Sequence, residues 1–314
     1  MQRLLVVGLL AVMMLAAPAS AQDNQQALDT VRAALDQFLA LDTYSASIEQ
    51  ISEQNMFMSA AGKNQRTTQQ RHAQGELIVE KTPADHLANR HLTVSRDITT
   101  TDGATGQTQQ YQDAFEVIVV DDHVYINLDV PPELRDMVPA GWTDITGGAS
   151  DFPGLEVVFD TESQLNWGTV IAPEHLDASS VLQVEIPPAI TVDGRTVDRY
   201  RLTLDPSLAL DTLSTRALAG MFHPGAAFDV PGYLDRIGTD PNSVFTVDVA
   251  VFADDGSLYE YTAHLTSDIT LPADLITTPM PTSEAEIRIT QDFRRTLRPT
   301  DLNVPVSITA PDVP

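Results

Sequence analysis

The sequence predicts an α+β fold in which one large, curved antiparallel β-sheet, a half-barrel, has helices covering its concave face. Three observations support this prediction: one helical pattern near the start, many segments with a two-residue apolar period, and tight turns between several of them. Antiparallel strands joined by short turns need no crossover helices. No sharp break in composition divides residues 22–314, so we expect them to form a single domain.

Residues 1–21 have the pattern of a cleavable secretory signal peptide. Arg3 precedes an apolar run over residues 4–17, and an A-x-A site follows at residues 19–21. A membrane anchor is the alternative, but a helix that spans a bilayer needs about 20 apolar residues. Pro18 interrupts this run before that length is reached. The sequence therefore predicts cleavage after Ala21 and a secreted or cell-envelope location.

The composition describes an acidic chain without disulfides. It holds 18 Lys and Arg against 44 Asp and Glu, and no cysteine. Stability must therefore come from a large buried core, which a chain of this length can form. The lack of cysteine also removes the acylation site of a bacterial lipoprotein, so we expect no lipid anchor. A negative surface repels phosphate backbones, which argues against nucleic acid as a partner, and we interpret the charge as a solubility feature.

The first element after the signal is an amphipathic helix, expected over residues 24–41. Its apolar side chains recur at helical spacing: Leu28, Val31, Leu35, Phe38 and Leu39. From Tyr44 the apolar period changes to two. The same pattern continues near residues 76–80 and 91–98, where Thr, Gln and Arg are expected on the opposite face of the sheet.

The clearest sheet element is a hairpin formed by residues 115–120 and 123–128. Asp121 and Asp122 join these two β-prone runs, and Asp is favoured in tight turns. Apolar residues occupy both faces of the first run. We therefore expect the hairpin to be covered on both sides and to lie centrally in the sheet.

The remaining strands are predicted by the same alternation of apolar residues: 182–186, 200–204, 245–251, 259–265, 285–293 and 304–308. Asp193-Gly194 and the sequence at 254–256 supply turns. The covered face of the hairpin over residues 245–265 should carry Val247, Val249, Val251, Tyr261 and Leu265, with Asp248 and Glu260 facing solvent.

Two regions rich in Pro and Gly are expected to form long loops, near residues 131–180 and 222–243. The first contains both tryptophans, Trp142 and Trp167. Between these loops, the leucine spacing within residues 206–222 predicts a short helix.

No motif of a catalytic or metal site is found in the sequence. There is no G-x-S-x-G and no H-E-x-x-H, and the seven histidines are scattered. The aspartate pairs at 121–122 and 254–255 fit turns better than calcium binding or catalysis. We therefore expect no enzyme activity, no cofactor and no metal, although a glycosidase-type carboxylate pair formed only in the folded protein stays open.

Three stretches resemble the LolA, LppX and LprG group of lipid-handling periplasmic and cell-envelope proteins. They are residues 122–128 (DHVYINL) leading to 142–145 (WTDI), residues 192–205 (VDGRTVDRYRLTLD), and residues 302–311 (LNVPVSITAP). The resemblance implies a helix, a strongly bent antiparallel sheet, and a hydrophobic cavity that accepts acyl chains without cofactor or reaction. The chain departs from the lipoprotein members because it lacks the lipobox cysteine and is longer.

The resulting hypothesis is an exported, non-enzymatic carrier or binder of lipids or other hydrophobic small molecules. A transient contact with a membrane or an envelope protein is a further expectation. Alternation alone supplies the candidates for the cavity lining: Phe115, Val117, Ile126, Leu128, Tyr200, Leu202, Phe245, Val247 and Tyr261. Binding is expected to depend on acyl chain length and little on salt, without a charged headgroup pocket. A structural or adhesive envelope domain with a filled core, and a secreted hydrolase using an Asp/Glu pair, remain alternatives.

Overall fold

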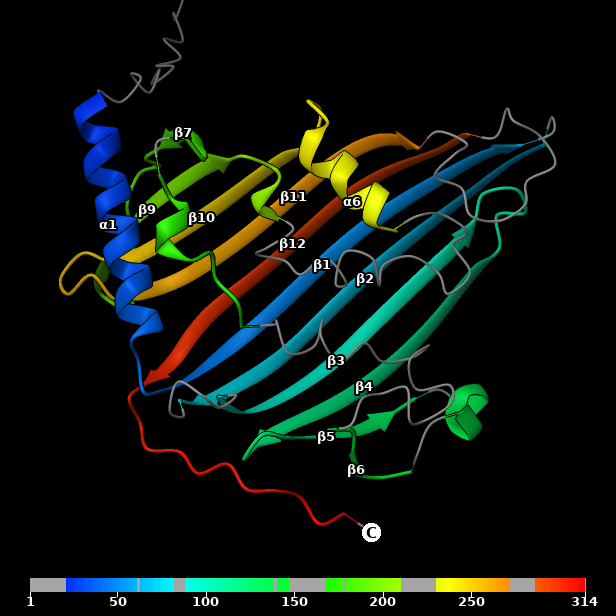
Figure 1. Ribbon diagram of the computed structural model, residues 1–314, viewed down its shortest axis with the longest axis horizontal. Coiled ribbons are helices and arrows are strands. Elements are labelled where there is room, and N and C mark those ends of the chain that lie inside the picture. The colour runs from blue at the N-terminus through cyan, green and yellow to red at the C-terminus, as the bar shows by residue number, and fades with distance from the viewer. Residues whose placement is uncertain are drawn as a thin grey trace, which may run out of the picture.

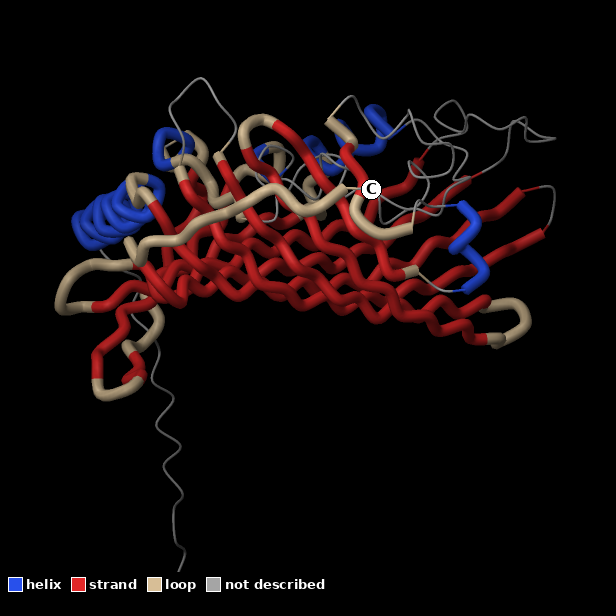
Figure 2. Tube along the Cα trace, turned by 90° about the horizontal axis from the view of Figure 1, so that it is seen from below, coloured by secondary structure: helices blue, strands red, loops and turns tan. Residues whose placement is uncertain are grey.

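The structure is a computed structural model that describes residues 21–60, 63–81, 88–130, 132–137, 140–146, 168–177, 179–209, 230–271 and 286–313. It contains one 12-stranded antiparallel sheet (Figure 1). Figure 2 shows the helices on one side of this sheet. The predicted fold class is confirmed.

The elements follow one another along the chain as α1 (Ala21–Leu39), β1 (Thr43–Ala60), β2 (Lys63–Glu80), β3 (Asn89–Asp102), β4 (Thr108–Val120), β5 (His123–Asp129), η1 (Pro132–Met137), β6 (Thr143–Asp144), η3 (Pro173–His175), β7 (Val181–Glu185), β8 (Ile190–Val192), β9 (Arg195–Leu204), α6 (Val230–Thr239), β10 (Val244–Phe252), β11 (Leu258–Leu271) and β12 (Glu286–Leu302). The order in the sheet is β6-β5-β4-β3-β2-β1-β12-β11-β10-β9-β7, and β8 pairs with β9. The first and last strands are therefore neighbours in the middle of the sheet. None of the described helices has both the length and the apolar character needed to cross a bilayer.

Helix α1 forms where the apolar period predicted it and ends two residues earlier. Leu28, Val31, Leu35 and Phe38 are buried along one stripe, as expected. Leu39 is 44% exposed because the helix ends at this residue and its side chain lies beyond the contact with the sheet. α1 packs against β7, β10, β11 and the η3 turn.

The hairpin of β4 and β5 forms as predicted, but it lies near one edge of the sheet. Asp121 and Asp122 have φ angles of 50° and 64°, the left-handed geometry of a tight two-residue hairpin turn. The expectation of a central hairpin is wrong, because only the two-residue strand β6 lies beyond β5. Both faces are nevertheless buried: Ile118 on the convex side is flanked by His91 and Tyr125 across the strands.

The predicted pattern of the second strand series is confirmed in β10 and β11 and fails in β7. All five residues expected on the covered face of the β10–β11 hairpin are buried, and Asp193 and Gly194 form the turn before β9 with positive φ angles. In β7, Leu182 is 64% exposed. A register shift between Val181 and Gln183 changes the phase, so that Val184 is the residue turned toward the core.

Helix α6 occupies part of the region expected as a loop over residues 222–243. Its buried side chains Tyr233 and Ile237 are one helical turn apart and pack onto the sheet. At the other end of the chain, residues 304–308 form no strand. Asn303 has a φ of 54° and turns the chain away after β12, leaving Val304 exposed.

Several predicted features lie outside the described residues. These are residues 1–20 of the predicted signal peptide, Trp167, and residues 210–222 of the helix expected within 206–222. Trp142 is half-buried just before β6.

Candidate ligand-binding face

Alternate residues of each strand point to the two faces of the sheet, and the convex face is built from charged pairs between neighbouring strands. Six of these pairs are His72 with Glu49, His91 with Glu116, Arg201 with Asp248, Arg288 with Asp268, Arg298 with Glu260, and His264 with Asp292. The hydrogen bond from His72 lowers the pKa of Glu49. Exposed pairs of this kind contribute little stability. They place six carboxylates on the convex side, each beside a histidine or an arginine.

The concave face carries two separate apolar clusters. The first, here the helix-covered cluster, joins α1 and α6 to β9, β10, β11 and β12. The second, here the β2–β5 cluster, consists of Ile48, Ala73, Leu77, Leu92, Val94, Phe115, Val117, Val119, Val124, Ile126 and Ile145. Within the described part of the chain, no helix residue belongs to the β2–β5 cluster.

The structure divides the predicted cavity residues between these two clusters. Leu202, Phe245, Val247 and Tyr261 are fully buried in the helix-covered cluster, and Tyr200 packs against it. The other four lie on the opposite half of the sheet: Phe115, Val117 and Ile126 are buried in the β2–β5 cluster, and Leu128 packs at its margin. The residues in the helix-covered cluster therefore form a core under α1 and α6. The residues in the β2–β5 cluster pack with no residue of a described helix.

The segment over residues 168–177 reaches both clusters: Val170, Ile171 and Leu176 belong to the helix-covered cluster, and Gly168 lies next to Leu77 of the β2–β5 cluster. The backbone N–H of Ile171 donates to the hydroxyl of Tyr261 at 3.1 Å, and burial raises the pKa of Tyr261. Gly168 lies so close to the sheet that a Cβ there would be 2.4 Å from Leu77 Cδ2. A side chain at this position would require the end of the Leu77 side chain to shift.

A row of polar side chains crosses the concave face of five strands. We call it the glutamine row: Thr100, Gln69, Gln54, Gln291 and Ser267, on β3, β2, β1, β12 and β11. Each member is the direct cross-strand partner of the next. The Tyr233 hydroxyl of α6 donates to Gln291 Oε1 at 2.6 Å, and Gln69 Nε2 donates to Thr100 Oγ1 at 3.5 Å.

Arginines lie on the same face, beside the glutamine row. Arg96 donates two hydrogen bonds to the Asp113 carboxylate, at 2.6 and 2.7 Å. Burial lowers the pKa of Arg71 and that of Arg295 to about 10 each. Arg295 also lies 3.4 Å from Gln50 Oε1. The concave face is therefore polar and positive along its middle, which is not the purely apolar lining that the sequence predicted.

Sequence reasoning missed the glutamine row, although β1 contains a signal for it. Every second residue of β1 points to the same face, and in this series Ala46, Ile48, Met56 and Met58 are apolar. Residues 50, 52 and 54 of the same series are Gln, Ser and Gln. These polar residues lie on the covered face by the same alternation. Of the polar residues expected on the opposite face near residues 91–98, Thr93 lies there, whereas Arg96 lies on the concave face.

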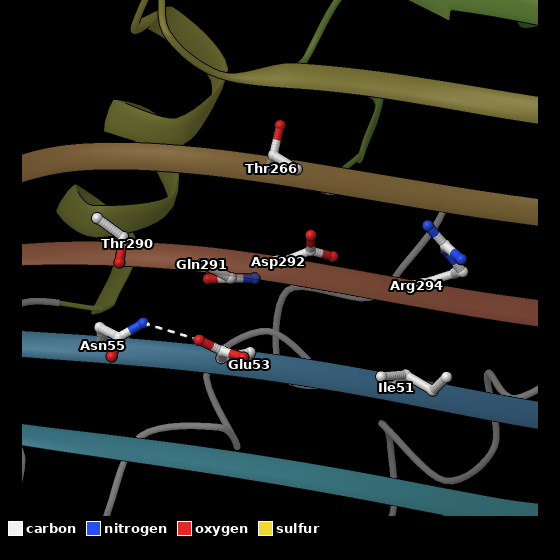
Figure 3. Close-up of a pocket in the computed structure, with 8 residues that line it drawn as sticks. All are labelled: Ile51, Glu53, Asn55, Thr266, Thr290, Gln291, Asp292 and Arg294. Atoms are coloured by element: carbon white, nitrogen blue, oxygen red, sulfur yellow. Dashed lines mark hydrogen bonds between the residues drawn. The ribbon is translucent and has the colours of Figure 1, made fainter.

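A groove of about 500 Å³ lies between β11, β12 and β1. Its lining comprises Ile51, Glu53, Asn55, Thr266, Thr290, Gln291, Asp292 and Arg294. Figure 3 shows these side chains spread along three strands, with Asn55 donating to Glu53 at 3.2 Å. They do not converge on one point, and the groove lacks the apolar lining that an acyl chain requires.

The aspartate pairs proposed as alternatives for chemistry have structural roles. Arg195 donates to both Asp254 and Asp255, at the turn between β10 and β11, and it lies 3.6 Å from the centroid of the Phe252 ring. Among the described residues, no group of three His, Asp or Glu side chains is arranged to hold a metal ion.

Comparison with known proteins gives similarities of structure only. No family model matches the chain, and no curated protein matches it. The lipoprotein LppX of Mycobacterium tuberculosis is similar, with 11% identity and a TM-score of 0.38 over 91% of this chain and 100% of that one. LprF of Mycobacterium bovis is also 11% identical, with a TM-score of 0.38 over 94% of this chain and 99% of the LprF chain. A DUF1329 family protein from Desulfovibrio piger is 11% identical, with a TM-score of 0.17 over 85% of this chain and 90% of that protein's chain. LppX is a member of the group that three stretches of the sequence resemble.

Proposed function

We propose that the exported chain binds a lipid-like molecule on its concave face and carries it outside the cytoplasm without catalysing a reaction. The observation that supports this proposal best is the β2–β5 cluster. It is an apolar surface spread over five strands of an open sheet, β1 to β5, and no helix residue of the described chain contributes to it. Its members are 0–7% exposed, so the face is apolar and shielded from water, as the lining of a lipid site is expected to be.

An acyl chain is suited to this apolar environment. Each buried CH₂ group contributes about 0.8 kcal/mol, so about ten methylenes would contribute roughly 8 kcal/mol before the costs of ordering the chain. This gross contribution equals the binding free energy of about a micromolar complex, and the ordering costs are subtracted from it. Leu128, at the margin of the cluster, would lie at the border of the bound chain.

A titration of the delipidated protein, residues 22–314, with a fluorescent fatty acid tests the proposal. Leu128→Trp should weaken uptake and leave the unfolding midpoint nearly unchanged, because Leu128 is only partly buried. The matched control is Val247→Trp, which overpacks the helix-covered cluster and should lower stability by about 1 to 3 kcal/mol. Lipid extraction from the native source should recover bound lipid. Absence of both bound lipid and saturable uptake would favour a structural envelope domain.

A further inference from the structure

On the basis of that proposed function, we propose that the glutamine row holds the polar head of the ligand. The head would be a polyol group whose oxygen atoms can both accept and donate hydrogen bonds, carrying either a phosphate or only ester and hydroxyl groups. The acyl chains would then lie on the neighbouring β2–β5 cluster.

The first argument is that three amides of the row are deeply buried with one hydrogen-bonding atom unsatisfied. Gln54, Gln69 and Gln291 are 7%, 9% and 4% exposed. Gln54 Nε2, Gln69 Oε1 and Gln291 Nε2 have no hydrogen-bond partner among the described residues. A buried polar atom left unpaired is unfavourable, and native proteins pair nearly all of them.

The second argument concerns the chemistry of the missing partner. Gln291 uses its Oε1 to accept from Tyr233, so its free Nε2 requires an acceptor, as does Gln54 Nε2. Gln69 uses its Nε2 toward Thr100, so its free Oε1 requires a donor. A head group with ester or phosphate oxygens and a hydroxyl supplies two acceptors and a donor.

The third argument is the spacing of these amides. The three glutamines stand on adjacent strands in direct register, and neighbouring strands are about 4.8 Å apart. The unsatisfied atoms therefore spread over about two strand spacings. One group with several oxygen atoms can reach all three positions, whereas a single small molecule such as water pairs with only part of the row.

The fourth argument is the charge beside the row. Arg71 follows Gln69 by two residues on β2 and lies on the same face, and Arg295 lies four residues beyond Gln291 on β12. Both guanidinium groups remain charged at neutral pH. In a chain with a net charge of −26, this local positive potential favours a head rich in oxygen acceptors and distinguishes the row from the acidic convex face.

The position of the row also suits an amphipathic ligand. On β2 the chain passes from Gln69 through Arg71 to Ala73, the first member of the β2–β5 cluster on that strand. Four residues of a strand span about 13 Å. A head at the row would therefore leave its acyl chains over the apolar half of β2, β3 and β4.

The test replaces the amides with an apolar side chain of similar length, as Gln54→Met and Gln291→Met in the delipidated protein. Each variant should weaken binding of two fluorescent lipids with identical acyl chains, phosphatidylglycerol and diacylglycerol, by about 3- to 10-fold, the effect of one buried hydrogen bond. Gln110→Met, an exposed glutamine on the convex side of β4, is the matched control and should change neither affinity. The urea midpoint of Gln54→Met should stay equal to or above that of the parent protein, because an amide with an unsatisfied Nε2 is removed. The midpoint of Gln291→Met should fall, because the Tyr233 hydroxyl loses the acceptor that Gln291 Oε1 provides.

The outcomes separate this proposal from the proposed function. A loss confined to phosphatidylglycerol would identify the phosphate as the group held by the row, and equal losses would identify the ester and hydroxyl oxygens. If both lipids bind the parent protein and neither affinity changes in the variants, the row does not hold the head, while carriage of lipids stands. If neither lipid nor the apolar probe N-phenyl-1-naphthylamine binds the parent protein, the proposed function itself fails.

Discussion

Removing the carboxylate of Asp113 should destabilise the protein far more than a typical loss of a charged residue. The ion pair of Arg96 and Asp113 lies between the glutamine row and the β2–β5 cluster, with side-chain exposures of 17% and 6%. The two groups are direct cross-strand partners on β3 and β4. Asp113→Asn keeps the shape of the side chain and leaves the guanidinium without its countercharge.

The magnitude follows from the burial of the pair. Breaking a buried ion pair by removing one partner costs about 3 to 5 kcal/mol, and the residual exposure of Arg96 favours the lower end of that range. A loss of about 3 kcal/mol should lower the melting temperature by roughly 5 to 10 °C. By contrast, the double variant Arg96→Met with Asp113→Leu should lie within about 1 kcal/mol of the parent protein, because both charges are removed together.

Urea denaturation of the parent, Arg96→Met, Asp113→Leu and the double variant that combines them gives the coupling free energy directly. The double variant should be markedly more stable than the sum of the single losses predicts. If Asp113→Asn shifts the midpoint no more than an exposed substitution does, or if the losses are additive, the pair is not buried in solution and the described register of β3 and β4 is wrong.

Three further predictions test the fold and the processing of the chain. Val249→Asp should unfold the protein, since it buries an unpaired charge, whereas Asp248→Asn removes only an exposed ion pair and should cost about 1 kcal/mol or less by urea denaturation; equal effects would contradict the register of β10. Gly168→Ala should cost about 1 kcal/mol, because the added Cβ requires the end of the Leu77 side chain to shift. Leu77→Ala should remove that loss, and an additive double variant would disprove the contact. N-terminal sequencing of the exported protein should begin at Gln22, and a product that retains residues 1–21 would contradict cleavage.

The elements that sequence reasoning predicted well are those whose pattern is local. The buried stripe of α1 and the two-residue turn at Asp121 and Asp122 follow from residues within a few positions of one another. The same holds for the β10–β11 hairpin, because side chains two residues apart on a strand point to the same face of the sheet.

The features that sequence reasoning missed depend on pairings between distant segments. Gln54 and Gln291 become neighbours only because β1 pairs with β12, and neither residue is unusual in its own strand. The register shift after Val181 is equally invisible in the sequence, because one extra residue reverses the phase of β7 without altering its composition. The division of the predicted lining into two clusters likewise follows from the order of strands, which alternation does not determine.

The pairing of the first and last strands has a consequence for how the chain folds. Tyr44 pairs with Leu302 and Met58 with Ile287, so the centre of the sheet can close only after nearly the whole chain is available. Contacts between such distant residues slow folding, because their loop-closure entropy must be overcome first. Until β12 is in place, β1 and β11 present open edges able to pair with other chains. A chain that crosses a membrane unfolded would therefore pass through a long aggregation-prone stage, and deleting β12 would leave two separate sheets rather than a shortened one.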